Sequence, residues 1–316
     1  MKEGFLLIGI ITFAYGSPTS LDDLETYYTH IHHGKKQPPK KVEQLKNQFR
    51  QIGIGDTLGS ITQRQMKAIA STLQAHLKEP VKGYVANKHT SPFVKDIVTQ
   101  MVKDGVTKII TFPIKPLHSK TGVVYYQILV KNALKQLNSD IPVLDMENWH
   151  NHTSLINVLS NRVKTAWDWL PYQGKDHALV IFTSHSLPGK QDTHHAFVKQ
   201  FTELARLIAK QANITQWRIA YRSAGTHGGP WLGPDIKEVI EQEAQQGCQG
   251  LVVCELLSLT SNVETTFDIR FDIQPICRKW NIEFFQTAML DDSFDFIMAL
   301  KQIVLDKMAL TSFLSK

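Results

Sequence analysis

Eight short apolar runs alternate with amphipathic segments along this chain, and this alternation restricts the fold more than any other feature. The runs, which we predict to be buried strands, lie at 5–14, 82–87, 108–113, 142–145, 178–184, 217–222, 250–256 and 282–285. Between most of them apolar residues recur at helical spacing, at 63–77, 93–104, 123–138, 153–169, 196–213, 235–246 and 292–310. Strands and helices that alternate in this way form βαβ units with parallel strands. The sequence therefore predicts an α/β fold.

The chain is long enough for two domains. With 316 residues it exceeds the size at which a single hydrophobic core usually stops growing. The predicted strands divide into two groups of four near 171–176, a polar stretch that contains proline and glycine and suits a linker. We predict two Rossmann-like domains, 1–174 and 175–290, each a four-stranded parallel sheet flanked by helices. The remainder, 291–316, is predicted to be a helix that packs back on the first domain.

Residues 17–60 form a long irregular insertion between the first strand and the first regular helix. Long connections of this kind are often functional; the alternative is an exposed insertion without a role. The run 53-GIGDTLG-59 resembles a glycine-rich nucleotide loop, but it follows a helix-like segment at 44–52 instead of a strand. A lone glycine run without its strand is weak evidence for a dinucleotide site, so NAD is not expected.

Charge and cysteine content exclude several classes of protein. The net charge of +6 is dispersed, with clusters only at Lys35–Lys36 and Lys40–Lys41, so no nucleic-acid partner is expected. Three cysteines without CxxC spacing predict neither a disulfide framework nor an iron–sulfur cluster, and indicate a cytoplasmic protein. The apolar opening 5–15 is interpreted as a strand, not a signal peptide, and no apolar run reaches the roughly 18 residues of a membrane span.

Reactive side chains follow the ends of several predicted strands. His185 comes directly after the strand at 178–184, and Glu264 follows the strand at 250–256 after a short polar turn. In an open parallel sheet, ligands bind beyond the carboxyl ends of the strands. An imidazole that faces a carboxylate there can bind a divalent metal or move protons near neutral pH. Tyr15, His89 and Ser223 occupy the same topological position, although any one of them alone is more often structural.

Glu264 begins a row of carboxylates with Asp268 and Asp272, spaced i, i+4 and i+8. On a regular helix this spacing spreads the three over an arc of about 80°, whereas a π-type widening would bring them into line, and such bulges cluster at functional sites. Three carboxylates repel one another unless cations or solvent intervene. The alternative is a solvated helix face. Glu264 is the strongest candidate because it is nearest the strand end.

Four segments and this acidic helix together carry a family signature. They are 13-FAYGSP-18, 25-ETYYTHI-31, 184-SHSLP-188, 229-GPWLGPD-235 and the helix with Glu264, Asp268 and Asp272. These residues resemble the ferrochelatase family, specifically the compact, water-soluble type of Gram-positive bacteria that acts on coproporphyrin III, over about residues 4 to 310. The resemblance implies two Rossmann-like domains with a porphyrin cleft between them. It also implies insertion of Fe²⁺ into coproporphyrin III, which gives coproheme in haem biosynthesis.

The same resemblance implies roles for individual residues. His185 and Glu264 would be catalytic and would flank the metal path, and Asp268 and Asp272 would deliver iron or hold a second divalent cation such as Mg²⁺. Tyr15 would lie on the opposite face of the porphyrin. The porphyrin-binding wall would comprise Tyr15, Ile31, His32, Gln48, Phe49, Asp56, His89, Tyr126, Ser223 and Trp231. Porphyrin and ferrous iron would be the only partners of a monomer without a prosthetic group.

The chain departs from the family on the porphyrin side. The family commonly carries arginine at the position of His32, an Arg-Tyr pair at Gln48–Phe49, serine at Asp56, and histidine at Asn262. A guanidinium binds a carboxylate bidentately, which imidazole and amide groups cannot do. Three hypotheses therefore stay open: a coproporphyrin III ferrochelatase, a chelatase for another metal or for protoporphyrin IX, and a porphyrin- or haem-binding protein without turnover. The intact His185–Glu264 pair argues against the last, because a carrier needs no base.

Overall fold

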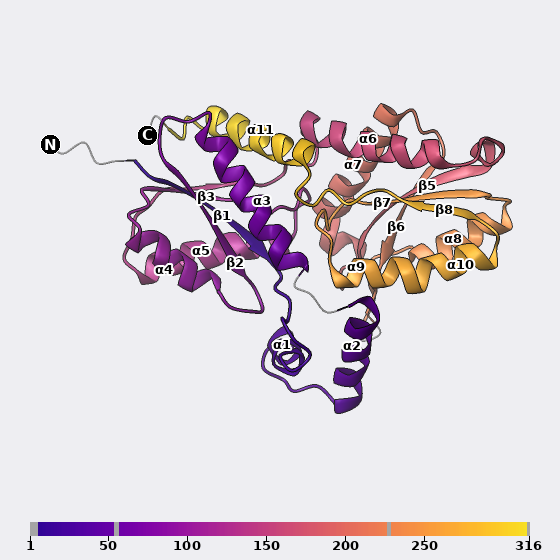
Figure 1. The fold of residues 1–316 in the computed structure, drawn as a ribbon, viewed down its shortest axis with the longest axis horizontal. Coiled ribbons are helices and arrows are strands. Elements are labelled where there is room, and N and C mark those ends of the chain that lie inside the picture. Colours follow the sequence, from indigo (N-terminus) through magenta and orange to yellow (C-terminus); the bar gives the residue numbers. More distant parts are fainter. Residues whose placement is uncertain (1–5, 54–56, 226–228, 315–316) are drawn as a thin grey trace.

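The computed structural model describes residues 6–53, 57–225 and 229–314. Within these residues the strands form two parallel sheets of four, in the orders β2-β1-β3-β4 and β6-β5-β7-β8 (Figure 1). The strands are β1 (Ile8–Ala14), β2 (Val81–Asn87), β3 (Lys108–Thr111), β4 (Val143–Asp145), β5 (Ala178–His185), β6 (Trp217–Arg222), β7 (Gly250–Glu255) and β8 (Glu283–Gln286). The predicted α/β fold with two parallel sheets is confirmed.

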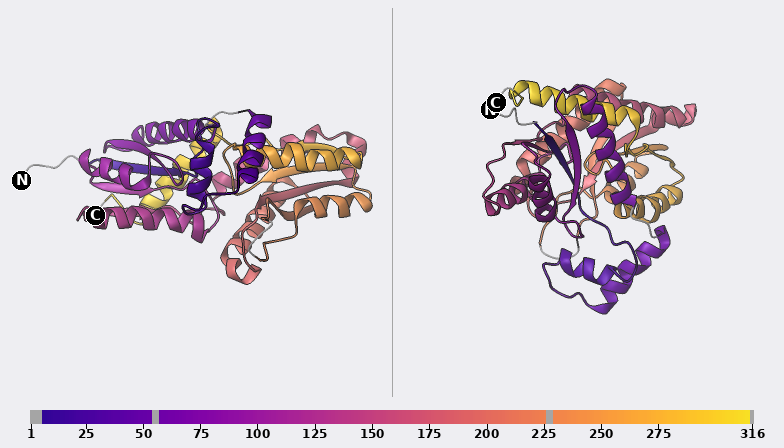
Figure 2. Two further views of the ribbon diagram at one scale, coloured as in Figure 1. Left: turned by 90° about the horizontal axis from the view of Figure 1, so that it is seen from below. Right: turned by 60° about the vertical axis from the view of Figure 1, so that its left-hand side comes forward.

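Helices cover both faces of the sheets (Figure 2). In the first half α3 packs on β1 and β2, and α4 packs on α5; in the second, α6 packs on α7 and α10 on α8. The α-helices are α1 (Leu24–Ile31), α2 (Pro39–Ile52), α3 (Thr57–Gln74), α4 (Val94–Lys103), α5 (Tyr125–Gln136), α6 (Thr153–Trp169), α7 (His195–Ala212), α8 (Ile236–Gln245), α9 (Val263–Phe267), α10 (Gln274–Lys279) and α11 (Phe294–Leu310). Two π-helical segments, η1 (Lys120–Val124) and η4 (Asp268–Ile273), precede α5 and α10.

The central strands read as continuous apolar runs because helices bury them on both sides. All seven residues of β1 and all six of β7 are buried. The register of the second sheet places His185 beside Arg222 and Thr183 beside Glu255. Because these pairs lie at the carboxyl ends of β5, β6 and β7, the sheet brings their side chains to one edge.

One hydrophobic core cluster extends across both halves, from Ile8 and Leu155 through Phe182 to Leu300. Each half has a further cluster of its own on the other face of its sheet. Helix α6 precedes the predicted boundary at 174/175, yet it packs against α7, β7 and β8, and α11 packs on both α3 and α6. The final helix thus spans both halves, and the predicted boundary itself stays a prediction. No helix among the described residues combines the length and the apolar character needed to cross a bilayer.

The segment 17–60 is mostly helical, so its interpretation as irregular was wrong. Its helices α1 and α2 project from the body of the molecule (Figure 1), and α2 packs on α1 and on α9 of the second half. They expose most of their surface, and the apolar side chains buried in them are only Leu24, Val42 and Phe49. So few buried residues leave a weak periodic pattern, which is why the sequence did not reveal α1.

Candidate active site

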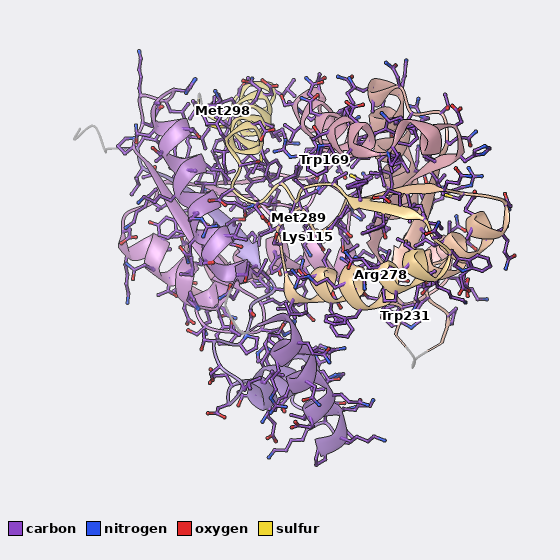
Figure 3. All side chains as sticks on the ribbon, turned by 45° about the vertical axis from the view of Figure 1, so that its right-hand side comes forward. Lys115, Trp169, Trp231, Arg278, Met289 and Met298 are labelled. Atoms are coloured by element: carbon purple, nitrogen blue, oxygen red, sulfur yellow. The ribbon has the colours of Figure 1, made fainter. Side chains whose placement is uncertain are left out.

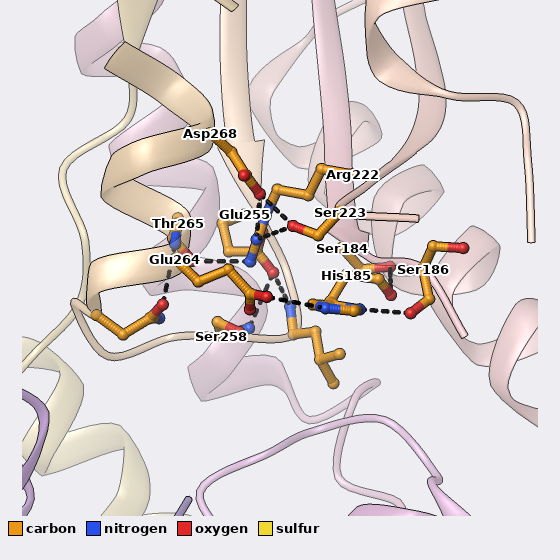
Figure 4. A network of polar contacts seen from close by, with 12 residues as sticks. Ser184, His185, Ser186, Arg222, Ser223, Glu255, Ser258, Glu264, Thr265 and Asp268 are labelled. Carbon is orange, nitrogen blue, oxygen red and sulfur yellow. Dashed lines mark hydrogen bonds and ion pairs between the residues drawn. The ribbon is translucent and has the colours of Figure 1, made fainter. Parts of the chain in front are cut away.

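The end of β5 and the first turn of α9 bring His185 and Glu264 together. His185 Nε2 lies 3.2 Å from Glu264 Oε1 (Figure 4). The other ring nitrogen, Nδ1, makes a short hydrogen bond to the carbonyl oxygen of Ser186. That bond fixes the ring and leaves Nε2 directed at the carboxylate. The side chains are 28% and 56% exposed respectively, so both are open to a ligand.

Each member of this pair favours the charged form of the other. Burial lowers the pKa of His185, but the hydrogen bond and the charge of Glu264 outweigh it, so the pKa lies above its ordinary value. Burial likewise raises the pKa of Glu264, but His185, with the cations of Arg222 and Lys115, holds it below its ordinary value. The pair can therefore hold a proton between its two members or exchange it for a metal.

Local capping explains the position of Glu264. The Asn262 side-chain oxygen accepts a hydrogen bond from the Thr265 backbone N–H at 3.0 Å, so Asn262 caps α9. This is a standard use of asparagine, and it is open to Asn262 where the family commonly carries histidine. Glu264 then lies in the first turn of the helix, facing the end of β5.

The helix widens after this turn, and the carboxylates of the acidic row lie in different surroundings. The π-helical segment η4 begins at Asp268 and contains Asp272, as the spacing of the carboxylates allowed. Asp268 is buried and accepts a hydrogen bond from Arg222 Nη1 at 2.8 Å and a short one from Ser223 Oγ. Asp272 is partly buried. Among the described residues no three histidine, cysteine or acidic side chains are arranged to hold a metal ion together.

Arg222 lies in this region and was missed by the sequence analysis. Its side chain is 1% exposed, although it ends an edge strand. It forms ion pairs with Glu255 and Asp268 and lies between β7 and α9 (Figure 4). An arginine at the carboxyl end of a strand, one position before the candidate Ser223, was the available signal.

The first half presents aromatic and cationic groups to the same region. Tyr15, 39% exposed, follows β1 and packs its ring 4.4 Å from that of His89. Burial and the charge of Glu264 raise the pKa of Tyr15 to about 12. Burial and the Lys88 charge lower the pKa of Lys115, which the charge of Glu264 opposes. The charge of Glu264 thus acts on both Tyr15 and Lys115, which belong to the first half, and Figure 3 shows Lys115 near the junction of the two halves.

Lys88 and Tyr125 also lie here and were missed. Lys88 Nζ is 4.7 Å from the centre of the Tyr125 ring and 5.7 Å from that of Tyr15. Its ammonium donates to the Thr121 carbonyl oxygen at 3.2 Å, and burial lowers its pKa. Lys88 directly precedes the predicted His89, so its place beside a strand end was visible in the sequence.

The other predicted porphyrin-binding residues are dispersed. Tyr126 is in the core, where its hydroxyl donates to the Ala14 carbonyl oxygen at 3.2 Å and its ring stacks on Phe13. Phe49 is buried in α2, and the ring of Trp231 lies 6.5 Å from that of His185. Ile31, His32 and Gln48 are partly buried on or beside α1 and α2, and Asp56 lies outside the described residues. His89 is buried and bonds His30 through the two Nδ1 atoms, 2.9 Å apart.

Comparison with known proteins identifies the family of the chain. The chain is 29% identical over 308 residues to the coproporphyrin III ferrochelatase of Bacillus subtilis, covering 95% of this chain and 98% of that protein. It is 30% identical over 304 residues to coproporphyrin III ferrochelatase 2 of Bacillus cereus, covering 95% and 94% respectively. Its fold is similar to that of SirB from Bacillus subtilis with Fe³⁺, with a TM-score of 0.61, 14% identity, and 97% and 98% coverage of the two chains. The ferrochelatase family model matches residues 7–308, and the chain belongs to this family of metal chelatases.

Proposed function

We propose that this protein inserts Fe²⁺ into coproporphyrin III and so produces coproheme in haem biosynthesis. The observation that carries the proposal is the His185–Glu264 pair, in which Nε2 and Oε1 lie 3.2 Å apart. The names of relatives that match nearly the whole chain support coproporphyrin III as the substrate. Iron is the substrate, and we propose no prosthetic group.

The pair supplies what metallation requires. The macrocycle must lose its pyrrole protons, and the metal must exchange water for nitrogen ligands, so a base and an oxygen or nitrogen ligand are needed. The Glu264 carboxylate accepts protons, and His185 Nε2 takes up the metal or passes the proton on. Because each group shifts the pKa of the other, we treat the two as one site. Tyr15, on the opposite side, is a neutral phenol throughout the physiological range and packs against the other face of the ring.

Lysines replace the expected arginines as partners for propionate groups. His32 and Gln48 lie on the projecting helices and are poor partners for carboxylates. Lys88 is half-buried beside exposed aromatic rings. Coproporphyrin III carries more propionates than protoporphyrin IX, so a site with Lys88 and Lys115 favours the former. We further propose that the protein acts as a monomer in the cytoplasm, with Cys248, Cys254 and Cys277 as free thiols.

One assay tests the proposal against its alternatives. The protein is mixed anaerobically with Fe²⁺ and either coproporphyrin III or protoporphyrin IX, and the loss of free-porphyrin fluorescence is followed. We expect rapid loss with coproporphyrin III and slow loss with protoporphyrin IX. Zn²⁺ and Co²⁺ in place of Fe²⁺ test the choice of metal. Stoichiometric binding of coproporphyrin without metallation by any of the three would instead indicate a carrier.

A further inference from the structure

The ion-pair network behind the His185–Glu264 pair is centred on one buried cation. Arg222 Nε donates to Glu255 Oε2 at 2.9 Å, and Nη1 donates to Asp268 Oδ2 at 2.8 Å. Nη2 donates to Thr265 Oγ1 at 2.7 Å. Each nitrogen of the guanidinium therefore has its own oxygen partner, and these partners come from β7, α9 and η4.

Both carboxylates that bond Arg222 accept further hydrogen bonds as well. Glu255 Oε1 accepts hydrogen bonds from the backbone N–H groups of Leu257 and Ser258, each at 2.9 Å. Asp268 accepts from the hydroxyl of Ser223, which has a left-handed backbone with φ of 58°. This conformation is uncommon outside glycine and costs free energy unless the surroundings enforce it. Thus strand ends and helix are tied to one guanidinium.

The second divalent cation that the family resemblance implies at Asp268 and Asp272 does not fit this arrangement. Asp268 Oδ2 already takes two donors, Arg222 Nη1 and Ser223 Oγ. A cation bound there would have to displace a buried guanidinium or lie beside it in a region of low dielectric, where like charges repel strongly. Removing a partner from a buried ion pair leaves an uncompensated charge, which is costly. No step of metal insertion is therefore assigned to a second cation.

We propose that Arg222 is the resident cation of the acidic row and replaces the second divalent cation. By holding Asp268 and Thr265, Arg222 keeps Glu264 as the carboxylate of the row that is presented to incoming iron. Arg222 is thus a positioning residue: it does not touch the substrate, but it ties α9 to β6 at the register position next to His185. This inference rests on the proposed function for its meaning, but the cation that fills the row can be identified without any chelatase reaction.

The first experiment measures cation binding in the absence of porphyrin and iron. Mn²⁺ is the probe because it is paramagnetic and prefers the oxygen ligands of Mg²⁺ sites. Free Mn²⁺ is titrated by electron paramagnetic resonance against the parent protein and Asp272→Asn. We expect no Mn²⁺ binding that depends on Asp272: any binding at the His185–Glu264 pair should be the same in the two proteins. Saturable binding by the parent that Mg²⁺ displaces and Asp272→Asn abolishes would overturn the proposal.

The second experiment removes the resident cation with little loss of packing. The double variant Arg222→Gln/Glu255→Gln replaces the ion pair by an amide pair and keeps a carbonyl oxygen for the N–H groups of Leu257 and Ser258. Asp268 then has no guanidinium partner, so the double variant should bind Mn²⁺. Added Mg²⁺ should displace the bound Mn²⁺. Circular dichroism checks the fold. A folded double variant without Mn²⁺ binding would contradict the proposal, and if it does not fold, the measurements on the parent and Asp272→Asn still decide.

The rate of iron insertion then shows whether replacing Arg222 by a divalent cation changes the activity. At constant ionic strength the parent rate should not depend on Mg²⁺. The double variant should insert iron at least tenfold more slowly, and Mg²⁺ should restore part of the lost rate. A loss of rate caused by misfolding alone would not respond to Mg²⁺. That outcome would refute the role of Arg222 as a replacement cation. Arg218→Gln is the matched control, because Arg218 lies on the same strand, is 47% exposed and pairs with Glu243 at 2.9 Å. If coproporphyrin is not a substrate, the Mn²⁺ results still stand.

Discussion

The strand ends of the two halves meet at one site but are built differently. In the second half, His185 bonds Glu264, and beside this pair Arg222 bonds Glu255 and Asp268 (Figure 4). In the first half, burial lowers the pKa of Lys88 and Lys115. His89 Nε2 is buried with no hydrogen-bond partner among the described residues.

The difference indicates that the two halves have different roles. A satisfied polar network holds side chains at fixed positions, which a group that handles metal and protons requires. A buried lysine whose pKa is lowered gains stability when an anion approaches, because the anion offsets the cost of desolvating its charge. We infer that the second half holds the reacting groups in place and that the first half is completed by the carboxylates of the substrate.

The largest effect is expected from Glu264→Gln, which keeps the volume and removes the base. The rate of iron insertion should fall by about 10²–10⁴-fold, the usual contribution of one acid–base group. Coproporphyrin binding, measured by fluorescence titration, should change little, because the second half contributes chemistry more than affinity. Asp272→Asn is the comparison variant and should be much milder. Equal losses of rate in the two variants would mean that the row acts as a whole.

The same variant should reverse the pKa shift of His185. In the parent, Glu264 raises this pKa above 6.5 against the effect of burial. Without the carboxylate, burial should dominate and the pKa should fall below 6.5, which a pH titration of the imidazole by NMR would detect. Because the pKa of His185 is raised and that of Glu264 is lowered, the pair stabilises the fold fully between about pH 4.5 and 6.5. This stabilisation is lost as pH rises through the folded pKa of His185 and as pH falls through the folded pKa of Glu264. An unchanged pKa in Glu264→Gln would contradict the coupling.

In the first half, Lys88→Ala should weaken substrate binding more than it slows the reaction. The ammonium is half-buried between the Tyr15 and Tyr125 rings, and a charge-assisted bond to a propionate is worth about 1.5–3 kcal/mol. The Kd for coproporphyrin should rise about tenfold or more, with a smaller change in kcat. Lys82→Ala is the control, because Lys82 lies on β2, the strand that Lys88 directly follows, and forms an ion pair with Asp104. A fall in kcat at constant Kd would place Lys88 in the chemistry instead.

Local sequence patterns predicted the strands of both sheets well. The contacts that the sequence did not reveal join residues that are far apart in the chain. The predicted ends of β5 and β7 agree with the structure to within one residue, because short apolar runs specify buried strands directly. The partners of Arg222 are 33 and 46 residues away in the sequence. Their meeting depends on strand register and on the place of α9, which no local pattern encodes.

In the candidate site, too, some features followed from the sequence and others depended on long-range packing. Topology alone indicated that His185 and Glu264 lie close together, since both follow strands of one parallel sheet. Tyr126 was assigned to the porphyrin wall by resemblance, and the structure buries it against Phe13. Neighbouring Tyr125 is exposed instead, because the two residues follow a π-helical segment whose effect on the helix face could not be derived from regular spacing.

The smallest effect is expected on the projecting helices, at His32. Burial and the charges of Lys41 and His33 lower the pKa of His32, so the ring is neutral at pH 7 and offers no cation to a propionate. If His32 contacts the substrate, coproporphyrin should bind more tightly only as pH falls below about 6.5. His32→Arg carries its charge at every pH, so it should tighten binding at pH 7 by about 0.5–1 kcal/mol, as expected for an exposed ion pair, and remove the pH dependence. Lys41→Gln sharpens the test: with this cation gone, the pKa of His32 should rise and the binding transition should move to higher pH. A profile that is the same in all three proteins would show that the insertion covers the substrate without binding its carboxylates.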